Sequence, residues 1–202
     1  MYRICIFAKA PVAGQAKTRL APVLGLDGAA ALARQMLEQT CLQAGAVAGA
    51  EVQLCTSPGP DDPSWSGLLP PGVFATAQGD GDLGARLAGV ARRVIDEGDC
   101  PVLIGSDCPA LGSARLAAAC AMLDRNDAFV HPTEDGGYAL LALRRFSPLL
   151  FSEIAWSGPE VLAQTVARLS RLGWRYAIGE VLRDIDEPAD YQAYLRSSDR
   201  VY

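Results

Sequence analysis

The chain has 202 residues, of which 50% are hydrophobic and 20% are charged, a balance typical of compact globular proteins rather than disordered or fibrous ones. Its net charge of −5 argues against a general affinity for nucleic acid or anionic lipid, so any phosphate would be bound locally. The longest uncharged stretch, residues 63–79, contains three prolines and therefore predicts no membrane-spanning helix.

Strand-like and helix-like segments alternate along the chain. Most of the strand-like segments are continuous apolar runs, which favours strands covered on both faces in a largely parallel sheet. We therefore predict an α/β fold, a three-layer α/β/α sandwich with a mainly parallel, mixed sheet. The predicted strands are residues 2–8, 51–56, 73–77, 101–107, 128–132, 137–143 and 174–181, and the predicted helices are residues 27–44, 82–97, 113–124, 159–172 and 187–196.

Three details of this prediction concern particular segments. The helix at 27–44 has Asp27 as a candidate N-cap and Gly45 as its end. The strand at 137–143 follows a loop too short for a crossover helix, so it either pairs antiparallel or lies at an edge. The proline-rich segment 57–72 is predicted to be a surface loop over the mouth of the site.

Residues 1–202 are expected to form a single domain, and the start of the chain reads as a strand rather than a signal peptide, so we expect a cytoplasmic protein. The six cysteines include no C-x-x-C pair, and the chain has one histidine. This spacing argues against a thiolate zinc site or a disulfide framework, and we interpret the cysteines as small buried hydrophobic residues.

The loop after the first strand is a candidate phosphate site. Only two of the 18 basic residues are lysines, Lys9 and Lys17, and both lie in this loop with Arg19. Gly14 would let the backbone approach a ligand, and the three cations could offset the charge of a diphosphate or triphosphate. The loop is not a Walker A motif because Ala16 precedes Lys17. The alternative is a solvated basic loop without a ligand.

Gly105-Ser106-Asp107-Cys108-Pro109 lies at the carboxyl end of the most hydrophobic predicted strand. An aspartate at the carboxyl end of a buried parallel strand can hold Mg²⁺ or Mn²⁺, with substrate phosphates completing the coordination. We predict Asp107 as a metal ligand, the alternative being that it caps the helix that begins near Ser113.

Further acidic and basic residues could share this site. Asp135 lies in Glu134-Asp135-Gly136-Gly137-Tyr138, and Asp186 lies in the late loop Asp184-Ile185-Asp186-Glu187-Pro188. Either could be a second metal ligand or bind a substrate hydroxyl, although turn chemistry explains both almost as well. Arg86 is a candidate anion-binding residue near a helix N-terminus, where Asp82 is expected to be a cap. His131 is the single histidine, and without a G-x-S-x-G motif a hydrolytic triad is not expected.

Five motifs taken together resemble a known bacterial family. They are K-x-P-x-x-G-x-x-K-T-R-L at Lys9–Leu20, G-S-D-C-P, E-D-G-G-Y, Trp156-Ser157 before a helix, and D-I-D-x-x-x-D near the end. In this order they are similar to the family labelled DUF2064 or radical-SAM/selenodomain-associated transferase 1, in the nucleotide-diphospho-sugar transferase (GT-A) superfamily. The resemblance covers the chain from Ile4 to about Leu195.

The resemblance implies a GT-A fold, a nucleotide over the first loop, including Lys17 and Thr18, and Mg²⁺ or Mn²⁺ on Asp107. The first loop is also similar to the signatures of sugar-phosphate nucleotidyltransferases and phospholactate guanylyltransferases. It departs from the former because Ala16-Lys17 replaces Gly-x-Gly and because no lysine follows Lys17, so that Arg86 would have to substitute. Gly158 stands where the family usually has threonine after the serine.

Two catalytic functions and one binding function remain open at this point. The first is a metal-dependent glycosyltransferase-like enzyme with a nucleotide-activated sugar donor and a small acceptor, in which Lys9, Lys17 and Arg19 hold the diphosphate and Asp135 binds the acceptor. The alternative is a nucleotidyltransferase that moves a nucleoside monophosphate from an NTP to a phosphorylated small molecule. The third is a non-catalytic nucleotide sensor. The sequence does not indicate the oligomeric state.

Overall fold

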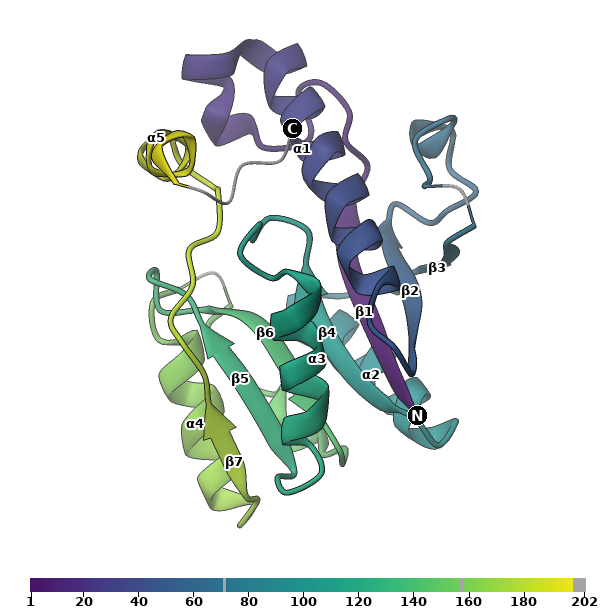
Figure 1. Ribbon diagram of the computed structural model, residues 1–202, viewed down its shortest axis with the longest axis vertical. Helices are drawn as coiled ribbons and strands as arrows, with labels where there is room; N and C mark the ends of the chain where they lie inside the picture. The colour runs from purple at the N-terminus through teal and green to yellow at the C-terminus, as the bar shows by residue number, and fades with distance from the viewer. Residues whose placement is uncertain (71, 157, 198–202) are drawn as a thin grey trace.

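The computed structural model describes residues 1–70, 72–156 and 158–197, which form a mixed sheet between two layers of helices (Figure 1). Within these residues the seven strands lie in the order β3, β2, β1, β4, β6, β5 and β7. Their bounds are β1 Tyr2–Lys9, β2 Ala50–Ser57, β3 Phe74–Ala77, β4 Cys100–Gly105, β5 Ala128–Pro132, β6 Tyr138–Leu143 and β7 Tyr176–Ile178.

All neighbouring strands are parallel except β6, which runs antiparallel to both β4 and β5. The expectation that this segment is antiparallel is therefore confirmed, whereas its alternative placement at an edge is wrong. The strand lies inside the sheet because its residues Ala139–Leu143 are buried on both faces. An edge position would leave the backbone N–H and C=O groups on one side of the strand without strand partners.

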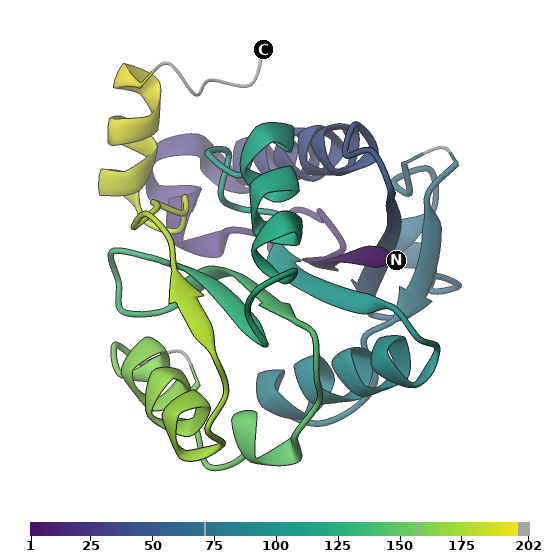
Figure 2. The ribbon, with the colours of Figure 1, turned by 60° about the horizontal axis from the view of Figure 1, so that its bottom comes forward.

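The helices form one layer on each face of the sheet (Figure 2). α1 and α3 pack on the face that contains Ile4, Ile6 and Ile104, while α2 and α4 pack on the face that contains Cys5 and Leu103. The alternation of neighbouring residues between two cores explains the continuous apolar runs and confirms the predicted sandwich. The bounds are α1 Ala21–Gly45, α2 Leu83–Asp96, α3 Ser113–Met122, α4 Val161–Arg171 and α5 Pro188–Arg196.

The start of α1 differs from the prediction. The helix begins at Ala21 instead of Asp27 and is broken at Gly25, whose φ of 69° and ψ of 171° are not helical. Pro22 suits the first turn of the earlier segment, and glycine accepts the positive φ without a steric penalty. The predicted end at Gly45 and the predicted Asp82 cap of α2 both agree with the structure, since the Asp82 carboxylate accepts a hydrogen bond from Ala85 N.

Two other expectations concern the cysteines and the segment 57–72. All six cysteines are free, and five are buried, while Cys100 is partly exposed. Segment 57–72 contains a short 3-10 helix, Pro63–Trp65, and is anchored by Trp65, which is 1% exposed and donates from its indole to Pro58 O. Residue 71 of this segment lies outside the described residues.

The carboxyl ends of β1, β2 and β4 lie at one edge of the sheet. The register pairs Lys9 with Ser57 and Phe7 with Gly105, so the loops after these strands leave the sheet together. The first loop and the Asp107 loop therefore meet at this edge, as is typical of ligand sites in open α/β sheets. Across the described ranges, no helix has both the length and the apolar composition to cross a bilayer.

Candidate active site

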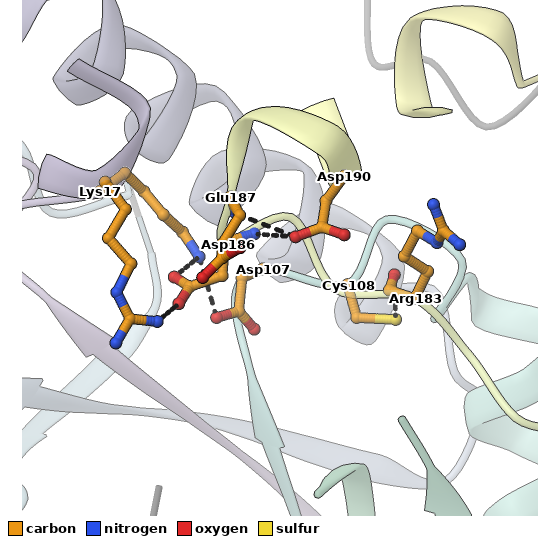
Figure 3. Close-up of polar contacts among 8 residues, drawn as sticks. Lys17, Asp107, Cys108, Arg183, Asp186, Glu187 and Asp190 are labelled. Carbon is orange, nitrogen blue, oxygen red and sulfur yellow. Dashed lines mark hydrogen bonds and ion pairs between the residues drawn. The ribbon is translucent and has the colours of Figure 1, made fainter. Parts of the chain in front are cut away.

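Lys17 joins the first loop to two acidic loops at the carboxyl edge of the sheet. Its Nζ atom lies 3.1 Å from Asp107 Oδ2 and 3.3 Å from Asp186 Oδ1, and Figure 3 shows the three side chains converging. On the other carboxylate oxygen of Asp186, Arg19 Nη1 donates at 2.6 Å. The structure thus brings together four candidate residues from three separate segments of the sequence.

The backbone holds Lys17 in an uncommon conformation. Its φ of 48° and ψ of 40° are left-handed, and the residue leads directly into a 3-10 turn at Thr18–Leu20. Such a conformation costs a non-glycine residue about 1 kcal/mol or more, so the surrounding contacts must maintain it. A turn in which Gln15 N and Ala16 N both donate to Val12 O precedes it.

Two backbone features place Asp107. Gly105 leaves room for the Asp107 carboxylate, because a Cβ at residue 105 would lie 2.6 Å from Asp107 Oδ1 and would displace it. The Asp107 carbonyl accepts a hydrogen bond from Ile185 N at 2.9 Å, which fixes the late acidic loop against the end of β4. Asp107 is therefore not an N-cap of α3, whose N-cap residue is Gly112.

Asp186 is positioned by the start of α5. The Asp190 carboxylate accepts from Asp186 N at 3.3 Å and from Glu187 N at 2.9 Å, as part of a capping box (Figure 3). One residue earlier, Ile185 is 2% exposed and faces the hydrophobic cluster under α1. Alternation in this extended segment places Asp184 and Asp186 on the opposite side from Ile185.

Asp184 is a residue whose importance the sequence analysis missed. Burial, together with the negative charges of Asp107 and Asp135, raises the pKa of Asp184 to about 6, although Lys17 opposes this rise. Asp184 therefore shares the electrostatic environment of the carboxylates at the sheet edge. The D-I-D motif in the sequence contains Asp184, but only Asp186 was selected as a candidate, because the motif does not show that Asp184 is partly buried.

The charge state of Lys17 is also set by this environment. Burial alone would lower the pKa of Lys17, but the Asp107 and Asp186 carboxylates outweigh it and the pKa is raised. The Lys17 side chain is 12% exposed, whereas Asp107 and Asp186 are 38% and 41% exposed. An ammonium with little access to solvent thus lies beside two carboxylates that solvent can reach.

Asp135 is held by its own turn. Its Oδ1 atom accepts from Thr133 Oγ1 at 2.5 Å and from Gly137 N at 3.0 Å. Gly136 has a φ of 88°, and a Cβ there would lie 2.1 Å from Pro159 O. The turn chemistry considered in the sequence analysis is therefore present, and it orients a carboxylate that is also an electrostatic neighbour of Asp184.

Arg86 lies at the same edge of the sheet, near β2. Its guanidinium donates to Gly81 O, to Ser57 Oγ and to Gln78 Oε1, at 3.1 Å, 3.3 Å and 3.3 Å. Gln78 is 8% exposed, and its amide nitrogen donates to Ala8 O and Cys55 O at the ends of β1 and β2. Gln78, which sequence reasoning did not select, therefore positions Arg86.

The remaining predicted residues are less tightly held. Lys9 ends β1 with an exposed side chain, and no ion pair joins it to another of the described residues. Gly14 is exposed with a φ of 78°, and Thr18 begins the 3-10 turn. His131 is 6% exposed, and its Nδ1 atom lies 3.0 Å from Glu180 O.

The segment before α4 packs on the start of α2. A Cβ at Gly84 would lie 2.2 Å from Trp156 Nε1, so the indole ring sits directly on the α2 backbone. Ser157, the other residue of this motif, lies outside the described residues. A cavity of about 340 Å³ is lined by residues that include Pro109, Leu182, Ile185 and Tyr194.

The donors available for a metal are the two carboxylates that face Lys17. No three His, Cys, Asp or Glu side chains converge into a complete metal site among the residues that the structure describes. Two carboxylates suffice where phosphate and water oxygens supply the remaining ligands, the usual case for Mg²⁺.

Comparisons with known proteins place the chain in a family. No curated protein matches it, but a candidate nucleotide-diphospho-sugar transferase from Desulfovibrio desulfuricans G20 is 30% identical, with 98% of this chain and 93% of that chain covered and a TM-score of 0.89. This relative confirms the predicted transferase class.

More distant structures share the fold. CMP:2-keto-3-deoxy-manno-octonic acid synthetase in complex with CTP is 19% identical, with 96% of each chain covered and a TM-score of 0.58. Rv0371c from Mycobacterium tuberculosis H37Rv in complex with manganese is 18% identical, with 98% of this chain and 100% of that chain covered and a TM-score of 0.50.

The family profile described as "Uncharacterized protein conserved in bacteria (DUF2064)" matches residues 36–158. This range includes Asp107 and Asp135, whereas Lys17 and Asp186 lie on either side of it. The chain belongs to the DUF2064 family and has the nucleotide-diphospho-sugar transferase fold.

Proposed function

We propose that the protein is a metal-dependent glycosyltransferase-like enzyme that takes a sugar from a nucleotide-activated donor and transfers it to a small acceptor. The observation that carries this proposal is the placement of the Lys17 ammonium between Asp107 and Asp186 at the carboxyl edge of the sheet. A transferase acting beside a diphosphate needs cations and metal-binding carboxylates at one place, and these residues supply both.

The carboxylates fit a divalent cation. One oxygen of Asp107 and one oxygen of Asp186 already form ion pairs with the same Lys17 ammonium, so the two carboxylates accommodate a positive group between them. Asp107 and Asp186 would hold Mg²⁺ or Mn²⁺, leaving other coordination positions for phosphate and water. When bound, the ion would stabilise negative charge on the departing nucleoside diphosphate.

The basic residues would bind the diphosphate. Lys17 and Arg19 lie at the carboxylates, and Lys9 is exposed at the end of the adjacent strand β1. Arg86, fixed by Gln78 and Ser57, offers a further guanidinium for an anionic or polar part of the donor. A positioned arginine loses little conformational freedom when it binds, which favours affinity.

Asp135 would bind the acceptor hydroxyl and receive its proton. The bonds from Thr133 and Gly137 fix one carboxylate oxygen and so orient the group before any acceptor arrives. A base held in place in this way contributes to catalysis through geometry as well as through its proton affinity.

A nucleotidyltransferase is the second candidate. It is supported by the fold shared with the CTP-bound synthetase, and the same cations and carboxylates would stabilise charge at an attacked α-phosphate. In that reaction the group transferred is a nucleoside monophosphate and the leaving group is pyrophosphate. The two functions therefore differ in their released product.

The test has two stages. First, nucleoside triphosphates and sugar nucleotides are screened by thermal shift with and without Mn²⁺, because a ligand bound only by the folded state raises its apparent stability. Second, each stabilising compound is incubated with hydroxylated and phosphorylated acceptors. Release of nucleoside diphosphate from a sugar nucleotide supports the proposal, and release of pyrophosphate from an NTP supports the second candidate. Binding without turnover of any compound would contradict both.

A further inference from the structure

We propose that Lys17 is an exchangeable counter-ion of the Asp107–Asp186 pair, so that a divalent metal and a phosphate ligand bind together rather than separately. This inference rests on the proposed function and adds that the binding of metal and the binding of phosphate at its site depend on each other. In the ligand-free protein the ammonium occupies the position between the two carboxylates, and a phosphate ligand draws it away.

The geometry gives Lys17 and a metal the same partners. Lys17 Nζ is within hydrogen-bond distance of one oxygen from each carboxylate, at 3.1 Å and 3.3 Å. A metal bridging Asp107 and Asp186 would stand between the same two groups. Two cations at such short separation repel each other strongly, so metal can bind well only after the ammonium has moved.

The burial pattern shows why the exchange needs an anion. The Lys17 side chain is 12% exposed, so it has little access to water that could solvate a displaced ammonium. A phosphate oxygen beside the loop would supply the replacement partner. The flexible four-carbon stem of lysine allows its ammonium to move while the loop backbone stays in place.

Arg19 is a second cation at the site, but its position differs from that of Lys17. Arg19 also contacts Asp186, but its side chain is 65% exposed and its bond goes to the other carboxylate oxygen. It therefore neutralises Asp186 from the solvent side and does not stand between the two carboxylates. Metal and phosphate ligand are then coupled through Lys17, and the coupling is reciprocal.

The experiment measures Mn²⁺ binding by calorimetry to the full chain, without nucleotide. The variants are Lys17→Met, Arg34→Met and Lys17→Met combined with Asp107→Asn. Arg34 pairs with Glu38 on the exposed surface of α1, so its variant removes one positive charge whose ion-pair partner is not a site residue. Lys17→Met keeps a long unbranched side chain at the left-handed position, and circular dichroism and thermal melting check that each variant folds.

The proposal predicts that Lys17→Met binds Mn²⁺ at least about tenfold more tightly than the wild type, because the competing cation is gone. Arg34→Met should bind Mn²⁺ like the wild type, and adding Asp107→Asn should remove the gain. If Lys17→Met binds Mn²⁺ no better than the wild type, and adding Asp107→Asn to it weakens that binding, the exchange is wrong but the metal site stands. If Asp107→Asn leaves the Mn²⁺ affinity of the folded Lys17→Met protein unchanged, or if no folded protein binds Mn²⁺, both the exchange and the proposed metal-dependent function are wrong.

A second measurement uses the wild-type protein alone. The chain has only two lysines, so a sample labelled with ¹³C-lysine gives two ε-methylene NMR signals, from Lys9 and Lys17. Inorganic pyrophosphate with Mg²⁺ should shift the Lys17 signal strongly, whereas Mg²⁺ alone at the same concentration should leave it nearly unchanged. A Lys17 signal that moves equally with Mg²⁺ alone, or that fails to move with both present, overturns the exchange.

Discussion

Lys17 Nζ lies 3.1 Å from Asp107 Oδ2, although the two residues are 90 positions apart in the chain. The contact joins the loop after β1 to the loop after β4, two strands that are neighbours in the sheet. Asp186 completes the arrangement from the start of α5. The proposed chemistry depends on this meeting of three loops, and the predictions below test it and the parts of the fold that support it.

Asp107→Asn should weaken Mn²⁺-dependent ligand binding by about tenfold or more, since a charged partner in such a site contributes about 1.5–3 kcal/mol. Asp96→Asn is the matched control, because Asp96 is a 68% exposed carboxylate that pairs with Arg92 along α2. Thermal shift with nucleotide and Mn²⁺ measures both. If Mn²⁺ increases the nucleotide-induced thermal shift equally in the two variants, Asp107 is not a metal ligand.

Gly84→Ala should lower the melting temperature, because the new Cβ would lie 2.2 Å from the Trp156 indole nitrogen and 2.9 Å from Phe151 O. We expect a cost of about 1–3 kcal/mol from this overpacking. Gly89→Ala in the same helix is the control, since a Cβ there meets nothing within 4 Å and should stabilise α2 by about 0.5–1 kcal/mol. Denaturant unfolding of both variants measures the difference, and a Gly84→Ala variant as stable as Gly89→Ala would contradict the packing of Trp156.

Gln78→Leu should destabilise the protein by about 1–3 kcal/mol, because Ala8 O and Cys55 O would lose a buried donor. The variant should also weaken ligand binding, since Arg86 would lose the acceptor that orients it. Gln192→Leu, at an exposed position on α5, should change neither property. A stable Gln78→Leu protein with full ligand affinity would show that Gln78 does not position Arg86.

Cys108 should resist alkylation although it follows Asp107 directly. Burial, with smaller contributions from the Asp107 and Asp184 charges, raises the pKa of the Cys108 thiol to about 12, so its reactive thiolate is scarce at pH 8. Cys100 is the cysteine that is not fully buried and should react with iodoacetamide at least about tenfold faster. Peptide mass spectrometry measures both rates. Rapid labelling of Cys108 would contradict the burial of its thiol beside Asp107.

The sequence predicted the layers and the edge of the sheet because both follow from local patterns. Continuous apolar runs such as Val102–Ile104 require cover on both faces, and polar residues directly after them lie at the carboxyl edge. That reasoning was enough to bring Lys17 and Asp107 to the same edge. It could not show that Lys17 bridges Asp107 and Asp186, because that contact depends on how loops from distant parts of the chain pack together.

Other features needed tertiary information as well. The interior position of β6 depends on which neighbours it pairs with, and its apolar sequence suits several positions. Asp184 gains its electrostatic role from burial beside Asp107 and Asp135, which a loop sequence rich in acidic residues does not reveal. Gln78 looks like an ordinary loop glutamine until the ends of β1 and β2 come within reach of its amide.

The most direct measurement is anomalous diffraction from crystals of the protein grown with Mn²⁺ and the sugar nucleotide that raises its melting temperature most. We predict a manganese peak between Asp107 and Asp186, with the Lys17 ammonium turned away from the carboxylates toward the phosphates of the ligand. A peak elsewhere, or a nucleotide lodged in the cavity beside Pro109 and Tyr194 with Lys17 still on both carboxylates, would contradict this prediction.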